Sequence, residues 1–221
     1  AIVAVNPQTA VLIVADGCGG MAAGEVAARL AVEHVVRGVL ARADSPRAGI
    51  LDGIEHANHA VLDLGAGAGT TLVAVLLEDE KVQTYHVGDS QVALVGGRGR
   101  VKLLTNAHSP VGYAVIAGLL DEQEALAHED RHLVSNLIGT DEMHVEIGAK
   151  RAVAPRDVLV LSSDGLSDNL LLDELVAQTR HGASPAVAAR LGQSARQRME
   201  SPEPEAPSKP DDLTLITYSR R

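Results

Sequence analysis

Hydrophobic positions along the chain alternate between continuous apolar runs, which are typical of buried strands, and runs with a helical repeat. The first such run, residues 10–15, ends at Asp16-Gly17 and predicts a buried strand that enters a tight turn. After a cluster of glycines the repeat changes, because apolar residues recur at every fourth position. This spacing predicts an amphipathic helix whose buried face carries Ala27, Ala31, Val35 and Val39.

The same patterns divide the rest of the chain. Strands are predicted at 70–77, 82–87, 91–95, 101–104, 158–161 and 213–218. Helices are predicted at about 47–64, 121–127, 130–138, 173–179 and 185–199. The connections at 78–81 and 88–90 have hairpin length. Strand runs interspersed with helical runs favour a layered α+β fold over a doubly wound parallel sheet.

Local sequence features mark where elements begin and end. Asp121 followed by Glu124 predicts a capping box at the start of a helix. Ser184-Pro185 predicts an N-cap followed by a first-turn proline. Residues 201–210 contain four prolines and are expected to form a loop. We interpret the chain, residues 1–221, as a single domain.

Composition excludes several classes of function. The 221 residues carry a net charge of −10, which makes nucleic acid an improbable partner. No apolar run approaches about 20 residues, so we expect no membrane span. The start of the chain lacks a basic region, so we expect no signal peptide and a cytoplasmic protein. The single cysteine excludes an internal disulfide and a four-thiolate zinc site.

Four aspartates lie at the ends of predicted strands: Asp16, Asp89, Asp164 and Asp211. Each on its own has an ordinary explanation, because Asp-Gly pairs are common in turns. Carboxylates at strand ends can also converge on one edge of a sheet layer, where their mutual repulsion requires cations. An all-oxygen cluster suits Mg²⁺ or Mn²⁺ better than zinc.

The motifs that contain these aspartates, taken together and in order, resemble those of the metal-dependent protein phosphatases of the PP2C type, most of all the bacterial serine/threonine phosphatases. The resemblance extends from about Val11 to Tyr218. The matching segments are Asp16-Gly17-Cys18-Gly19-Gly20 with Gly24-Glu25, Gly69-Thr70-Thr71-Leu72, His86-Val87-Gly88-Asp89-Ser90, Ser163-Asp164-Gly165-Leu166-Ser167-Asp168 and Asp211-Asp212-Leu213-Thr214.

This resemblance implies a fold and a set of metal ligands. The fold is a four-layer α-β-β-α sandwich, with two central antiparallel sheets flanked by helices, and residues 105–140 would form a flap beside the active site. Asp16 would bridge two Mn²⁺ or Mg²⁺ ions, and the Gly17 carbonyl would bind one of them. Asp164 and Asp211 would complete the other ion's shell. Asp89, Asp164 and Asp168 would hold a third, weaker ion.

The implied chemistry is hydrolysis of phosphoserine and phosphothreonine by a metal-activated water, with no catalytic protein nucleophile. Phosphorylated proteins would be the substrates, and a serine/threonine kinase would be the counterpart enzyme. Cys18 is then not a nucleophile, and no phosphate-cradling loop with a nearby arginine surrounds it. We expect Cys18 to serve loop packing, ahead of redox sensing or proton donation.

The chain departs from the family's pattern at several positions. The family carries an Arg and an Asn-Glu-Asp-like stretch before its first strands, and we expect that stretch upstream of Ala1. Gln91 replaces an Arg, and Ala107 replaces the Asp before His108-Ser109. His86 and His108 are expected to be structural, because the predicted metals prefer oxygen ligands.

These departures leave alternatives open. The fold could serve as a pseudophosphatase, a binding or regulatory module without activity, although the retained aspartates argue against it. A sporulation- or stress-type phosphatase that acts on an anti-sigma antagonist would share the chemistry and differ only in its substrate.

Overall fold

The structure is a computed structural model that describes residues 1–18, 23–65, 67–203 and 206–220. It divides the chain into two compact units. The first unit contains Ala1–Ser90 and Ser135–Ala152, and the second contains Gln91–Val134 and Val153–Arg221. Each unit is built around one antiparallel sheet, so the predicted α+β class with two antiparallel sheets is confirmed.

The sheet of the first unit has the strand order β1-β2-β3-β4-β7, and β8 also pairs with β4. The central strands β2 and β3 consist almost entirely of buried apolar residues, as expected of strands covered on both faces, whereas β4 also buries Gln83, Thr84 and His86. A two-residue turn at Asp79-Glu80, with both φ angles positive, joins β3 to β4 as predicted. The strands are β1 (Ile2–Asn6), β2 (Thr9–Val14), β3 (Leu72–Glu78), β4 (Lys81–Val87), β7 (Glu146–Ile147) and β8 (Arg151–Ala152).

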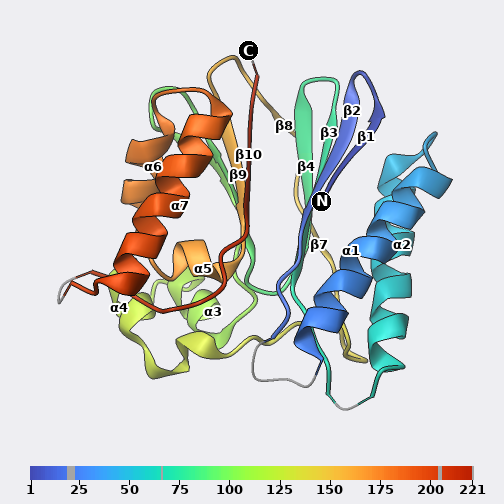
Figure 1. Cartoon of the computed structure of the whole chain (residues 1–221), viewed down its shortest axis with the longest axis horizontal. Helices are drawn as coiled ribbons and strands as arrows, with labels where there is room; N and C mark the ends of the chain where they lie inside the picture. Colours follow the sequence, from blue (N-terminus) through green and yellow to red (C-terminus); the bar gives the residue numbers. More distant parts are fainter. Residues whose placement is uncertain (19–22, 66, 204–205, 221) are drawn as a thin grey trace. The chain divides into compact units, whose positions relative to one another are not determined.

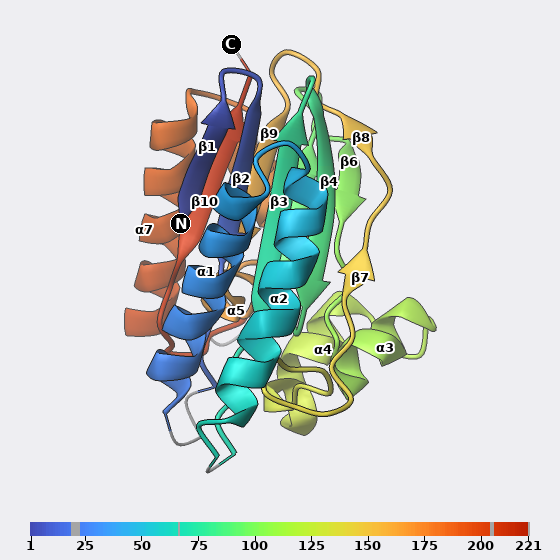
Figure 2. The same ribbon diagram turned by 90° about the vertical axis from the view of Figure 1, so that its right-hand side faces the viewer.

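Two long helices, α1 (Gly24–Ala41) and α2 (Pro46–Leu62), lie side by side over one face of this sheet (Figure 1, Figure 2). Their apolar stripes form a common core with β2 and β3. Glycines let the two helix backbones touch, since a Cβ on Gly38 would lie 2.2 Å from the Gly49 carbonyl oxygen. On the outer face Arg37 pairs with Glu33 at 3.3 Å, as expected of exposed helix charges.

The sheet of the second unit has the strand order β10-β9-β5-β6. Helix α7 packs on it through Val187, Leu191 and Ala195, which are fully buried against β9. The strands are β5 (Gln91–Val95), β6 (Val101–Leu104), β9 (Val158–Ser162) and β10 (Leu215–Ser219), and the helices beside them are α5 (Asp164–Ser167), α6 (Leu172–Thr179) and α7 (Ser184–Glu200).

The segment predicted as a flap forms three short helices, α3 (Pro110–Ile116), α4 (Glu122–Ala127) and the 3₁₀ helix η1 (Glu129–His132). The capping box of α4 is confirmed, because Asp121 and Glu124 each accept a backbone hydrogen bond from the other at 2.8 Å. The helix predicted over 130–138 is wrong beyond His132. Ile138 instead pairs with Thr70 through two backbone hydrogen bonds of 2.9 and 3.1 Å, which a helix would not allow.

Other local predictions are also corrected by the structure. The connection at 88–90 does not form a hairpin, because β4 pairs with β3, β7 and β8 whereas β5 pairs with β6 and β9. The strand β1 was not expected from the sequence. Ser184 is the first residue of α7 rather than its N-cap, and its hydroxyl donates to the Ser219 hydroxyl at 2.7 Å.

Among the helices in the described part of the chain, none combines the length and apolar character that a membrane span requires.

Candidate metal centre

The turn that contains Asp16 follows directly after β2 and is held against the start of β3. The Asp16 carbonyl oxygen accepts a hydrogen bond from the Thr71 amide at 2.8 Å and another from the Thr70 hydroxyl at 2.7 Å. Gly17 forms an isolated β-bridge with Thr70, and the Cys18 amide donates to the Gly69 carbonyl at 3.1 Å. The Gly69-Thr70-Thr71 segment therefore fixes the backbone that presents Asp16.

Glycines are required where this turn meets the first turn of α1. A Cβ on Gly17 would lie 2.1 Å from the Gly24 carbonyl oxygen, and one on Gly24 would lie 2.7 Å from the Cys18 carbonyl oxygen. Both distances are too short for any side chain, so the two glycines allow the strand end and the helix start to touch. Gly19 and Gly20 of the same motif lie outside the described residues.

The turn that contains Asp89 contacts Thr71 of this segment. Gly88 has a φ of +99°, and a Cβ there would lie 2.6 Å from the Thr71 Cβ. The buried hydroxyls of Thr71 and Ser90 are 2.7 Å apart and share a hydrogen bond. Thr71 thus touches both aspartate-bearing turns of the first unit and brings them together.

In the second unit, β9 is followed by Ser163 and then by Asp164, which opens α5, and Asp168 comes one helical turn later. The backbone of Asp211 and Asp212 packs against this turn, since a Cβ on Gly165 would lie 2.3 Å from the Asp212 carbonyl oxygen. Ser163 secures the same contact through a hydrogen bond from its amide to the Thr214 carbonyl at 3.0 Å. Residues 47 and 51 positions apart in sequence therefore become neighbours.

The carboxylates of Asp164, Asp168 and Asp211 converge on a single cation, the Lys209 ammonium. Its Nζ lies 2.8 Å from Asp164 Oδ2, 2.7 Å from Asp168 Oδ2 and 3.1 Å from Asp211 Oδ2. Burial and the Asp164 charge raise the pKa of Asp168, against the opposing effect of Lys209. Burial alone would lower the pKa of Lys209, but its hydrogen bonds to Asp164 and Asp168 outweigh burial and raise it.

The predicted ligands thus form two sets, Asp16, Gly17 and Asp89 in the first unit and Asp164, Asp168 and Asp211 in the second. The second set fits a hard divalent cation, because its carboxylate oxygens already surround one positive charge. Lys209 was not predicted to be part of the site. One signal could have revealed it, since it is the only basic residue between Arg198 and Arg220 and precedes Asp211 by two positions.

Cys18 and His86 lie in the first unit close to the predicted ligands in sequence. Cys18 is half-buried and, as the single cysteine of the chain, forms no internal disulfide; its expected packing role remains a prediction. His86 is almost fully buried on β4, with Nε2 4.0 Å from Glu146 Oε2 on the neighbouring strand β7.

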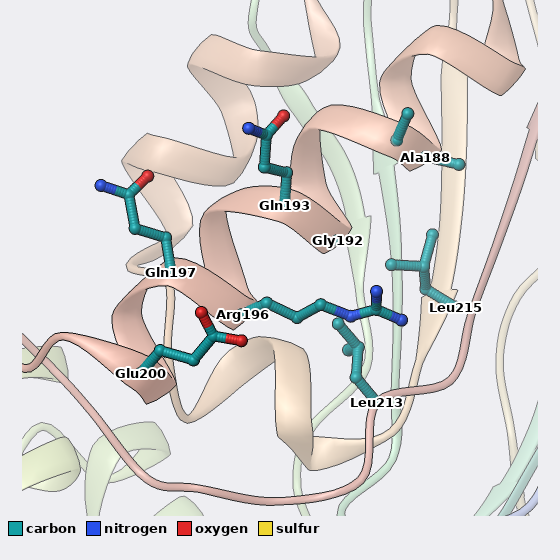
Figure 3. Close-up of a pocket in the computed structure, with 9 residues that line it drawn as sticks. Ala188, Gly192, Gln193, Arg196, Gln197, Glu200, Leu213 and Leu215 are labelled. Atoms are coloured by element: carbon teal, nitrogen blue, oxygen red, sulfur yellow. The ribbon is translucent and has the colours of Figure 1, made fainter.

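The second unit also contains a hollow of about 670 Å³ between α7 and β10 (Figure 3). Arg196 extends from α7 across this hollow toward Leu213 and Leu215. Its described lining includes one carboxylate, that of Glu200, so it offers no cluster of acidic oxygens. The hollow is therefore a poor candidate for the metal centre.

The family model described as protein phosphatase 2C matches residues 1–202, a range that contains all the predicted ligands except Asp211. A putative protein phosphatase 2C-type from Streptococcus pyogenes serotype M6 is 34% identical over 175 residues, which cover 75% of this chain and 70% of that protein.

Solved structures give the same result. The Streptococcus agalactiae serine/threonine phosphatase is 26% identical, with a TM-score of 0.79 over 97% of this chain and 90% of that one. The catalytic domain of the serine threonine protein phosphatase PstP, solved in complex with 2 manganese ions, shares the fold with a TM-score of 0.67 at 22% identity, over 98% of this chain and 89% of that one.

Proposed function

This chain belongs to the protein phosphatase 2C family of metal-dependent phosphoprotein phosphatases, and from that premise we propose that its strand-end aspartates hold the divalent cations with which it hydrolyses phosphoserine and phosphothreonine. The observation that carries the proposal is the convergence of Asp164, Asp168 and Asp211 on one positive charge at 2.7–3.1 Å. Three carboxylates gathered in this way would repel one another strongly without a cation between them.

We assign the ligands by the family's pattern. By that pattern, Asp16, the Gly17 carbonyl, Asp164 and Asp211 would hold two ions. Asp89, Asp164 and Asp168 would hold a third, weaker ion. The ions are Mn²⁺ or Mg²⁺, and the manganese complex of the structural neighbour PstP supports this choice.

Divalent cations bound there would supply water activation and charge neutralisation at the phosphoryl group. The contribution of the chain is to place the anionic ligands on rigid backbone. Hydrogen bonds from Thr70 and Thr71 fix the Asp16 carbonyl, and the contact of Gly165 with Asp212 fixes Asp164 against the segment that carries Asp211. The mechanism assigns no role as nucleophile to the Cys18 thiol.

Phosphorylated proteins are the substrates of this activity. A serine/threonine kinase as its counterpart, a cytoplasmic location and a single catalytic domain spanning residues 1–221 belong to the proposal. The alternative of an inactive binding module finds no support, because the matched relatives are themselves named as phosphatases.

The test is Mn²⁺-dependent hydrolysis of a small aryl phosphate and of a phosphothreonine peptide by the full chain. We expect activity on both substrates, its loss in EDTA and its return when Mn²⁺ is added in excess. A folded chain that binds Mn²⁺ but hydrolyses neither substrate would contradict the proposal and restore the inactive-module interpretation.

A further inference from the structure

Lys209 is a cation supplied by the chain itself at the cluster of Asp164, Asp168 and Asp211. The side chain of Lys209 is 23% exposed, and those of Asp164 and Asp168 are 18% and 13% exposed. All three contacts of the ammonium are shorter than 3.2 Å, so each carboxylate directs an oxygen at the same point. This arrangement differs from a surface ion pair, in which one flexible lysine meets one carboxylate.

The backbone of Lys209 is also fixed. Its amide donates to Asn169 Oδ1 at 2.9 Å, and Asn169 Nδ2 donates to the Lys209 carbonyl at 2.9 Å and to the Gly165 carbonyl at 3.0 Å. Asn169 is completely buried. The preceding Ser208 accepts a hydrogen bond from Arg131 at 3.2 Å and donates one to the Arg198 carbonyl at 2.9 Å. These hydrogen bonds hold the backbone of Lys209 beside the cluster.

A divalent cation and this ammonium cannot share the cluster. Mg²⁺ requires carboxylate oxygens at about 2.0–2.1 Å around it, in the space that Nζ occupies. The ammonium offsets one of the three negative charges, and a divalent ion would offset two. Binding of the ion thus requires Lys209 to leave and its three charged contacts to be exchanged for metal bonds.

We propose that Lys209 is the resident counter-ion of the Asp164–Asp168–Asp211 cluster in the metal-free protein, and that it competes with the divalent cation and so sets the metal concentration at which the cluster fills. The inference rests on the proposed function, which assigns these carboxylates to the metal. It makes Lys209 a positioning residue that acts through the ligands rather than on the substrate.

The experiment measures Mn²⁺ binding to the metal-stripped full chain by titration calorimetry, in the wild type and in Lys209→Gln. We expect Lys209→Gln to bind Mn²⁺ about tenfold or more tightly, because the competing charge is gone. In EDTA the same variant should melt at a lower temperature than the wild type, since its carboxylates then repel one another without compensation.

Two further variants separate competition from simple loss of an ion pair. Lys209→Arg keeps the charge and should keep the weaker Mn²⁺ affinity. Lys102→Gln removes another lysine of the same unit, whose Nζ lies 2.5 Å from the buried Asp157 Oδ2. It should lower the melting temperature without changing Mn²⁺ affinity.

A measurement on the wild type covers the case in which Lys209→Gln fails to fold. The chain has four lysines, so their side-chain ammonium resonances can be assigned by NMR. Saturation with Mg²⁺ should shift the Lys209 Nζ resonance toward that of a solvated lysine. An unmoved Lys209 resonance in the Mg²⁺-bound protein would overturn the inference.

The outcomes distinguish this inference from the proposed function. If wild type and Lys209→Gln bind Mn²⁺ with equal affinity and both are Mn²⁺-dependent phosphatases, competition by Lys209 is refuted and the function stands. If neither protein binds Mn²⁺, both the function and the inference fail.

Discussion

At the scale of single residues, the two adjacent aspartates at 211 and 212 offer a direct test of the metal centre. Asp211 directs Oδ2 at the cation position of the cluster, at 3.1 Å from Lys209 Nζ, whereas Asp212 packs its backbone against Gly165. Asp211→Asn should reduce Mn²⁺-dependent phosphatase activity by about 100-fold or more, equivalent to about 2.7 kcal/mol of barrier. Asp212→Asn should retain activity within about threefold. Equal losses in the two variants would exclude a specific ligand role for Asp211.

Cys18 provides a second residue-scale test, which concerns the nucleophile. It is half-buried beside the Asp16 turn, and its backbone amide already pairs with Gly69. Because the proposed mechanism uses water, Cys18→Ala should lower activity by less than about tenfold, or 1.4 kcal/mol of barrier. Asp16→Asn, measured in the same assay, should abolish activity. A loss in Cys18→Ala as large as that in Asp16→Asn would bring the thiol into the chemistry.

At the scale of elements, backbone contacts between strand ends and loops hold the ligands in place. A methyl group on Gly165 would lie 2.3 Å from the Asp212 carbonyl oxygen, so Gly165→Ala must push the start of α5 away from the segment before β10. We expect this variant to lose about 1–3 kcal/mol of unfolding free energy, as overpacked sites do. Urea denaturation measures the loss.

Gly192, in the middle of α7, is the matched control for Gly165. The nearest atom to a Cβ at Gly192 would be Leu215 Cδ2, at an ordinary contact distance of 3.8 Å. Gly192→Ala should therefore stabilise the chain by up to about 1 kcal/mol through helix propensity. Comparable destabilisation by both substitutions would mean that the close contact at Gly165 is not what limits stability.

At the scale of the whole molecule, the acidic balance of the chain couples metal binding to stability. The chain has a net charge of −10, and five of its aspartates are predicted metal ligands. Saturation of a site at 100 times its Kd adds about 2.7 kcal/mol to the unfolding free energy. For a chain of this size that corresponds to a rise of about 5–10 °C in Tm.

Thermal scans of the full chain in EDTA and in millimolar Mn²⁺ test this coupling. The rise should be smaller in Asp16→Asn, which has lost one of the proposed ligands. An unchanged Tm in the wild type, or an equal rise in Asp16→Asn, would argue against a metal centre that includes Asp16.

The sequence by itself determined the nature of the elements and the placement of the aspartates. Apolar runs such as 10–15 and 158–161 are strands because burial of both faces requires continuous apolar residues, and Asp16 and Asp164 follow them because a strand end is where polar residues can leave the core. The capping box at Asp121 was also predictable, because its two hydrogen bonds join residues only three positions apart in sequence.

Only the tertiary structure decided what depends on contacts between distant segments. The length of the 88–90 connection could not reveal that β4 and β5 belong to different sheets, because strand partners are chosen by packing rather than by loop length. Nor could the sequence show that the helical turn ends at His132. Ile138 pairs with Thr70, which is 68 positions away in sequence. Lys209 is the clearest case. In sequence it is one cation in a proline-rich loop, and only the buried Asn169 and the converging carboxylates make it the centre of an anionic cluster.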